Sequence, residues 1–142
     1  MNQLAICVSL IRTDYIGRFL ETLYKHTKDF KVFVCDQSVN GMDKELIKKY
    51  VHWYVRPHHN LGFAKSGNEL MWTAYRQGYP YIALCNDDVE YMDDSWFQGI
   101  KEEFATDEKI LVVCPESPRV AMWGYGLVNG EQVDIVPYKP EY

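Results

Sequence analysis

The sequence lacks several features that would assign it to common classes of protein. It has no G-x-x-x-x-G-K-[S/T] loop, and no G-x-G-x-x-G follows its first apolar run, where Ser9 to Thr13 stand instead. Kinase-like and dinucleotide-binding functions are therefore poor interpretations. Arg12 also interrupts the N-terminal apolar stretch well short of a membrane span, so we expect no transmembrane segment.

Basic residues are outnumbered by acidic ones, and the cysteines follow no metal-binding pattern. Lys and Arg number 15 against 20 Asp and Glu, which gives a net charge of −5. Proteins that bind nucleic acid by neutralising phosphates usually have a basic face, so nucleic acid is not an expected partner. The four cysteines lie in separate apolar runs without zinc-site spacing, and we interpret them as free buried thiols in a cytoplasmic chain. They are Cys7, Cys35, Cys85 and Cys114.

Apolar runs of strand length alternate with stretches of helical spacing along the chain. Strands are expected at residues 4–11, 31–35, 52–56, 81–85 and 110–114. Helices are expected around 16–23, at 44–50, from 64 to a stop at 78–80, and over 95–105. This alternation predicts an α/β fold with a mainly parallel sheet flanked by helices.

The last stretch breaks the alternation and predicts a hairpin. Ala121 to Tyr138 holds several glycines between apolar residues, including the turn signal Asn129-Gly130. At 142 residues the chain has the length of one domain. We therefore expect a single domain, with an α/β core over 1–115 and a hairpin extension over 116–142.

Helix starts carry recognisable capping residues. Thr13 or Asp14 is expected to cap the first helix. Asp94 or Ser95 is expected to cap the last one, with Gln98 three residues beyond Ser95 as in a capping box.

The most informative stretch is Tyr81 to Asp88, YIALCNDD. An apolar run of strand length ends there in Asn86, Asp87 and Asp88. Open α/β sheets bind ligands beyond the carboxyl ends of their strands, and paired acids there suit a divalent cation that bridges to phosphate oxygens. The alternative is a solvated strand end.

Two further motifs complete a pattern with this triplet. Asp36, Gln37 and Ser38 end the second expected strand, and N-L-G-F-A-K-S-G-N, from Asn60 to Asn68, opens a helix. In this order and spacing the motifs resemble those of the family 2 glycosyltransferases, over roughly residues 3–115. The resemblance implies the Rossmann-like GT-A fold and a nucleotide-sugar donor.

The resemblance also implies roles for individual residues. Asp36 would recognise the nucleoside base, usually uracil, and the backbone from Ile11 to Thr13 would line the same pocket. A carboxylate can accept the ring N–H of uracil, which cytosine lacks, so UDP or dTDP donors are favoured over CDP donors. Asp88 would coordinate Mn²⁺ or Mg²⁺. The donor's ribose, sugar and diphosphate would be bound by Asn60, Gly62, Lys65, Asn68, Asn86 and Asp87.

The implied activity is metal-dependent, inverting transfer of the donor sugar to a glycan, lipid or protein acceptor. Glu116, Glu131 and Asp134 are the nearby downstream carboxylates, and none lies in a context like the family's E-D motif, so no general base is assigned. The acceptor-binding half is expected to be short or absent, and pairing of two copies through the hairpin is a further hypothesis. Three alternatives stay open: an inactive nucleotide-sugar-binding domain, a module of a larger assembly, and a scaffold without ligand.

Overall fold

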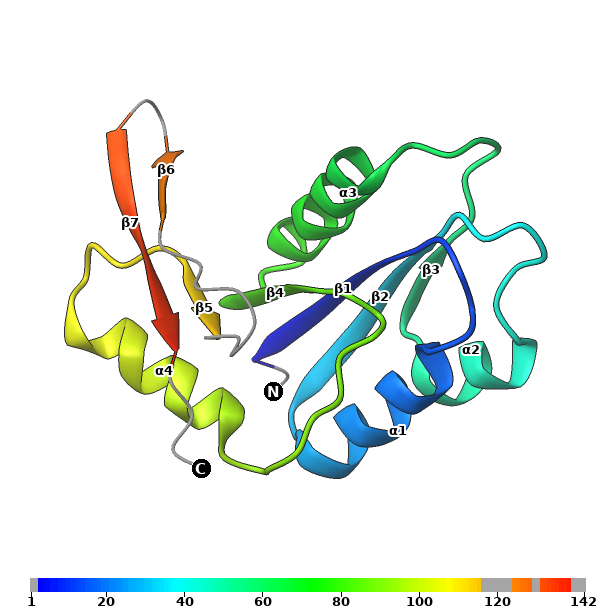
Figure 1. The fold of residues 1–142 in the computed structure, drawn as a ribbon, viewed down its shortest axis with the longest axis horizontal. Coiled ribbons are helices and arrows are strands. Elements are labelled where there is room, and N and C mark those ends of the chain that lie inside the picture. Colours follow the sequence, from blue (N-terminus) through cyan, green and yellow to red (C-terminus); the bar gives the residue numbers. More distant parts are fainter. Residues whose placement is uncertain (1–2, 116–123, 129–130, 139–142) are drawn as a thin grey trace. The chain divides into compact units, whose positions relative to one another are not determined.

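The computed structural model describes residues 3–115, 124–128 and 131–138 (Figure 1). The expected hairpin extension therefore lies partly outside the described residues, since Glu116 and the Asn129-Gly130 turn are not among them. The chain divides into two compact units, Met1–Met92 and Asp93–Tyr142, and each is considered by itself.

The first unit is built on four parallel strands. They are β1 (Leu4–Leu10), β2 (Phe30–Asp36), β3 (Trp53–Val55) and β4 (Tyr81–Cys85), in the order β3-β2-β1-β4. Leu4 pairs with Phe30 of β2 on one side and with Tyr81 of β4 on the other. Every residue of β1 is buried, as its apolar sequence LAICVSL requires of a central parallel strand. The parallel sheet predicted from the sequence is confirmed.

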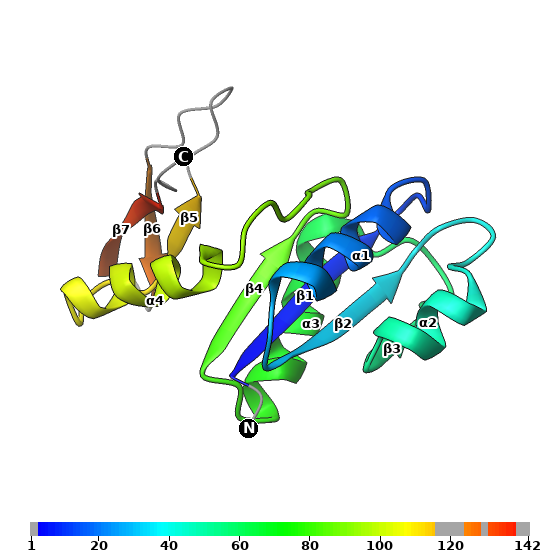
Figure 2. The same cartoon turned by 90° about the horizontal axis from the view of Figure 1, so that it is seen from below.

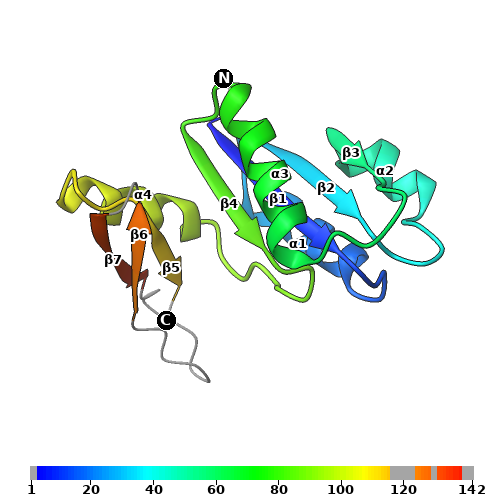
Figure 3. The same ribbon diagram turned by 90° about the horizontal axis from the view of Figure 1, so that it is seen from above.

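Three helices cover the two faces of this sheet. Helices α1 (Ile16–His26) and α2 (Lys44–Tyr50) lie on the face toward the viewer in Figure 2, and α3 (Phe63–Arg76) lies on the face seen in Figure 3. Helix α1 buries its predicted stripe, and α3 packs on β1, β2 and β4. The core beneath α3 consists of Ala5, Cys7, Phe33, Cys35, Leu70 and Ala74.

The cap predicted for the first helix is wrong. Helix α1 begins after Tyr15, whose side chain makes no capping hydrogen bond, and Asp14 instead lies 3.3 Å from Arg12 in an ion pair. The φ and ψ of Tyr15 are −110° and −15°. A side-chain cap needs an extended N-cap residue, and this helical conformation aims the side chain elsewhere. Thr13 and Asp14 therefore precede the helix without capping it.

The predicted capping box of α4 (Trp96–Thr106) fails for the same reason. Ser95 occupies the N-cap position with φ −95° and ψ −8° and makes no side-chain cap. Its hydroxyl donates to Asp93 Oδ1, while Gln98 Nε2 donates to Glu102 Oε1 at 2.9 Å. Asp43 shows the contrast, because its φ of −56° and ψ of 131° let it accept the backbone N–H groups of Glu45 and Leu46 at the start of α2.

The second unit combines α4 with a three-stranded sheet in the order β5-β7-β6. Strands β6 (Gly124–Val128) and β7 (Glu131–Tyr138) are antiparallel, with Gly124 opposite Ile135, and β5 (Val113–Pro115) pairs in parallel with β7. The predicted hairpin is confirmed by this antiparallel pair. Helix α4 contacts β5 and β7.

All four cysteines are free thiols, as the sequence predicts, but only Cys7 and Cys35 are buried by side-chain exposure, and Cys85 and Cys114 are half-buried. Burial raises the pKa of Cys7 to about 12 and that of Cys85 to about 11, so neither is a reactive thiolate at neutral pH. Among the helices of the described residues, none combines the length and the apolar character needed to cross a bilayer.

Candidate functional site

The sheet of the first unit has a topological switch point between β1 and β4. From β1 the chain proceeds to β2 and β3 on one side, and then returns across the other face through α3 to place β4 on the opposite side (Figure 1). Open α/β sheets bind their ligands just outside the carboxyl ends of the strands at such a point. The segments that follow β1 and β4 therefore border the candidate site.

The acid triplet lies at this switch point. Asn86, Asp87 and Asp88 follow β4 directly, and Cys85 pairs with Val8 near the end of β1. Asn86 and Asp88 are exposed, and Asp87 is half-buried. The structure thus places the predicted triplet beside the segment after β1, where Ile11 and Thr13 are also exposed.

The charged groups of these two segments interact electrostatically. Burial raises the pKa of the Asp87 carboxyl, and the negative charges of Asp88 and Asp14 raise it further. A hydrogen bond with the backbone of Asp87 itself and the Arg12 guanidinium partly offset this effect by lowering the same pKa. Charges from the segment after β1 therefore act on the Asp87 carboxyl after β4.

The loop that carries the triplet is fastened to α1 by Tyr91. This side chain is buried, and its ring meets that of Phe19 edge-on with centroids 5.7 Å apart. Its backbone N–H donates to Thr22 Oγ1 at 3.2 Å, and its hydroxyl lies 3.3 Å from Cys85 Sγ. Sequence analysis missed this anchor, because a single tyrosine in a short loop carries no periodic signal.

Asp36 is the centre of a hydrogen-bond cluster at the end of β2. Its side chain is fully buried, and Oδ1 accepts from the Ser38 N–H at 2.9 Å and the Ser38 hydroxyl at 2.5 Å. Oδ2 accepts from the Met42 N–H and the Tyr54 hydroxyl, each at 2.6 Å, and lies 3.5 Å from Arg56 Nη1. Burial by itself raises the pKa of Asp36, but these hydrogen bonds outweigh it and the net pKa is lowered.

A polar pocket of about 440 Å³ opens beside this cluster. Its walls are the segment from Asp36 to Val39 after β2 and the segment from Arg56 to Asn60 after β3. Asn60 Oδ1 accepts the Gly62 N–H at 2.7 Å, so the predicted donor-site asparagine also shapes the turn before α3.

Helix α3 begins without a side-chain cap. Its N-cap is Gly62, with φ 77° and ψ 168°, a conformation that is essentially restricted to glycine. A Cβ atom at Gly62 would meet no atom within 4 Å, so the backbone conformation rather than space requires the glycine. The N–H groups of an uncapped first turn attract anions, and Lys65 is exposed within that turn.

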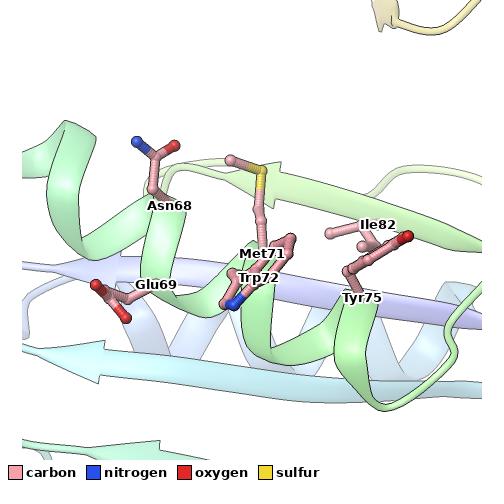
Figure 4. A pocket seen from close by; sticks show the side chains of 6 residues that line it. All are labelled: Asn68, Glu69, Met71, Trp72, Tyr75 and Ile82. Carbon is pink, nitrogen blue, oxygen red and sulfur yellow. The ribbon is translucent and has the colours of Figure 1, made fainter.

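Asn68 lies elsewhere on α3. It lines an open, largely apolar groove of about 580 Å³ whose side chains come from α3 and from Ile82 of β4 (Figure 4). The exposed rings of Trp72 and Tyr75 stack there, with centroids 5.4 Å apart. The residues that line the polar pocket after β2 do not include Asn68, and its role at the donor stays a prediction.

The carboxylates suit a cation that is shared with a ligand. Among the described residues, no three His, Cys, Asp or Glu side chains are grouped as a metal site. Asp88 is exposed next to Asp87, which supplies adjacent carboxylate oxygens on one loop. Mg²⁺ is commonly bound by one or two carboxylates together with substrate phosphates, so this set fits a metal completed by a diphosphate and not a closed protein site.

A parallel α/β sheet with acids and an uncapped helix start at the carboxyl ends of its strands belongs to the class of open α/β domains, which bind ligands at that edge and anions at helix N-termini. The sequence profile described as glycosyl transferase family 2 matches residues 6–127. The chain belongs to glycosyl transferase family 2, and the family predicted from the three motifs is confirmed.

A solved structure agrees with this assignment at the level of the fold. The crystal structure of S. aureus TarS 1-349 matches with a TM-score of 0.59 and 16% sequence identity. The match covers 84% of this chain and 37% of that chain. At this identity the likeness supports the GT-A fold alone. No curated protein matches the chain.

Proposed function

We propose that the chain binds a nucleoside diphosphate sugar at the switch point between β1 and β4 and transfers the sugar to an acceptor. One observation carries the proposal: the triplet after β4 lies beside the segment after β1, at the carboxyl edge of a parallel sheet in a family 2 glycosyltransferase. Both segments offer polar groups at the place where such sheets bind nucleotides.

The diphosphate is held between the triplet and the start of α3. Asp88 coordinates Mn²⁺ or Mg²⁺ there, with Asp87 and Asn86 beside it toward the ribose and the sugar. The uncapped N–H groups after Gly62 and the ammonium of Lys65 add positive potential. When bound, the cation supplies Lewis-acid stabilisation of the charge that develops on the leaving diphosphate.

The base enters the polar pocket between Asp36 and Asn60, with Ile11 and Thr13 on the side of β1. Recognition of a uracil or thymine N–H by Asp36 requires one of its internal contacts to open, because the carboxylate exposes no surface. The contact of 3.5 Å with Arg56 is the longest and therefore the first to give way. UDP and dTDP are the favoured donors.

Transfer proceeds by direct displacement at the anomeric carbon, with inversion, and the acceptor's general base is not assigned to a residue. A second candidate function is a donor-binding module of a larger assembly without turnover of its own. It is favoured by the fact that the chain matches only 37% of the TarS chain. Product formation from a bound donor separates the two. The cytoplasmic location and the homodimer stay predictions.

Calorimetric titration with UDP, dTDP and GDP, each with and without Mn²⁺, tests the proposal. We expect Mn²⁺-dependent binding of UDP or dTDP, and we expect Asp88→Ala to weaken it by at least about tenfold, the loss of one charged ligand contact. Asp88 is exposed, so this variant should stay within about 0.5 kcal/mol of wild-type stability.

Glu90→Ala is the matched control. Glu90 is an acid on the same loop that pairs with Arg18 at 3.3 Å, and its loss should leave Mn²⁺-dependent binding unchanged. Equal weakening by both substitutions would point to a general charge effect. Absence of binding for all three nucleotides would refute the proposed donor site.

A further inference from the structure

Three distant segments meet in one buried hydrogen-bond network below the start of α3. Gln37, directly after β2, directs its side chain at Ser9 of β1, at Ser66 in the first turn of α3 and at the backbone of Leu61. Gln37 Nε2 lies 3.1 Å from each serine Oγ, and Gln37 Oε1 lies 2.6 Å from the Leu61 nitrogen. Ser9 and Ser66 are both buried.

The donors and acceptors of this network fix the direction of the hydrogen bonds that Gln37 makes. The Leu61 N–H can only donate, so the side-chain atom of Gln37 that faces it is the carbonyl oxygen, and the amide hydrogens point at the two serines. Each hydroxyl then donates elsewhere. Ser66 donates to the Gly62 carbonyl at 2.7 Å, with the Phe63 carbonyl as a second acceptor at 3.1 Å, which leaves Ser9 to donate to Ser66 Oγ at 2.5 Å. Every side-chain hydrogen in the network has an acceptor.

The network acts on the turn that forms one wall of the polar pocket. Leu61 lies between Asn60, which lines that pocket, and Gly62, the N-cap of α3. The backbone N–H of Gln37 also donates to the Leu10 carbonyl at 2.7 Å, which fixes Gln37 itself against the end of β1. Through these hydrogen bonds, Gln37 joins the ends of β1 and β2 to the turn before α3.

We infer that Gln37 is a positioning residue that holds the turn from Asn60 to Gly62 in its ligand-binding conformation before the donor arrives. The inference rests on the proposed function for the identity of the ligand. A pocket that is already ordered avoids the entropic cost of ordering a loop on binding, so releasing the turn should weaken nucleotide affinity. Because Gln37 also lines the polar pocket, the exchange of the Leu61 amide in the ligand-free chain separates the positioning role from a direct contact with the nucleotide.

The experiment compares Gln37→Met and Gln37→Glu with the wild-type chain. Methionine has a similar length and cannot hold Leu61, whereas glutamate keeps an oxygen for the Leu61 N–H. In the ligand-free chain we expect amide exchange of Leu61, followed by NMR, to be at least about tenfold faster in Gln37→Met and close to wild type in Gln37→Glu. Gln98→Met, at an exposed glutamine whose side chain donates to Glu102 on the same helix, is the control.

The second measurement is the affinity for the nucleotide that wild type binds best among UDP, dTDP and GDP, with Mn²⁺. We expect Gln37→Met to weaken it about tenfold and Gln37→Glu to restore part of the loss. Unfolding midpoints and the exchange of core amides in β2 verify that each variant is folded; if Gln37→Met does not fold, Gln37→Ala replaces it.

Wild-type Leu61 exchange in Gln37→Met would overturn the positioning role. Released Leu61 with unchanged affinity would show that the turn does not serve the ligand. Failure of the wild-type chain to bind any nucleotide would refute the proposed function and the ligand part of this inference, while the exchange data would still decide whether Gln37 holds the turn.

Discussion

Asp36 illustrates how one residue serves structure and proposed function together. Four hydrogen bonds of 2.9 Å or less converge on a carboxylate that exposes none of its surface. An acceptor-only group is required there, because every partner is a donor. The family resemblance implies the ligand role of Asp36 at the end of a strand, but its hydrogen-bond donors come from loops and from β3, which no local sequence pattern connects to it.

We predict that Asp36→Asn destabilises the chain by about 2 to 3 kcal/mol at pH 7, because an amide turns two hydrogens toward donors in a buried site. Urea unfolding measures this change. Asp43→Asn is the matched control, since asparagine caps a helix as well as aspartate does and Asp43 is exposed. Equal midpoints for wild type and Asp36→Asn would contradict the structural role.

The same variant should remove a pH dependence. The folded pKa of Asp36 lies below its usual value of 3.8, so below that value the unfolded chain takes up a proton that the folded chain still excludes. The stability contributed by the carboxylate is therefore complete above about pH 4 and is lost as the pH falls toward the lowered folded pKa. We expect the stability difference between wild type and Asp36→Asn to shrink over that window.

At the scale of elements, the sequence predicts most helices and strands that have a periodic apolar pattern. The stripe of Ile16, Phe19, Leu20 and Leu23 identifies α1, and the apolar run of β4 agrees with the structure at both ends. Side-chain capping was predicted wrongly at α1 and α4, because a capping hydrogen bond depends on the backbone angles of one residue and not on a repeat. Ser9 and Ser66 were missed although each had a signal: Ser9 is the one polar residue in β1, and Ser66 lies on the buried face of α3 with Leu70 and Ala74.

The loop after β4 is held against α1 by Tyr91, and the contribution of this contact can be tested. We predict that Tyr91→Ala destabilises the first unit by about 3 kcal/mol, as expected when a buried aromatic ring is removed. Tyr91→Phe keeps the ring against Phe19 and removes the hydroxyl that lies against Cys85 Sγ, so its cost should stay below about 1 kcal/mol. Thermal unfolding measures both.

Loss of the Tyr91 contact should also loosen the loop that carries Asn86, Asp87 and Asp88. At a temperature where Tyr91→Ala is still folded, limited proteolysis should cut between residues 86 and 92 faster than in wild type or Tyr91→Phe, and Mn²⁺-dependent nucleotide binding should weaken. Unchanged cleavage would mean that the loop is held by contacts other than those of Tyr91.

At the scale of the whole molecule, the proposed donor site belongs to one of the two compact units. The residues assigned to base, diphosphate and metal all precede Asp93, and so does the network around Gln37. The sequence predicts one domain from chain length, which says how much core a chain can bury but not how its contacts are partitioned. The α/β alternation predicts the order of elements well, because each connection is local.

We therefore predict that a fragment of residues 1–92 folds cooperatively and binds the nucleotide with an affinity within about threefold of the full chain, less than the effect of one lost hydrogen bond. Urea unfolding followed by the fluorescence of Trp53 and Trp72, both in this unit, measures folding, and calorimetry with Mn²⁺ measures binding. The same fragment with Asp88→Ala is the control and should fold but bind weakly. A fragment that unfolds without a transition, or binds more than tenfold weaker, would mean that residues 93–142 complete the core or the site and that the single domain expected from the sequence is the right description.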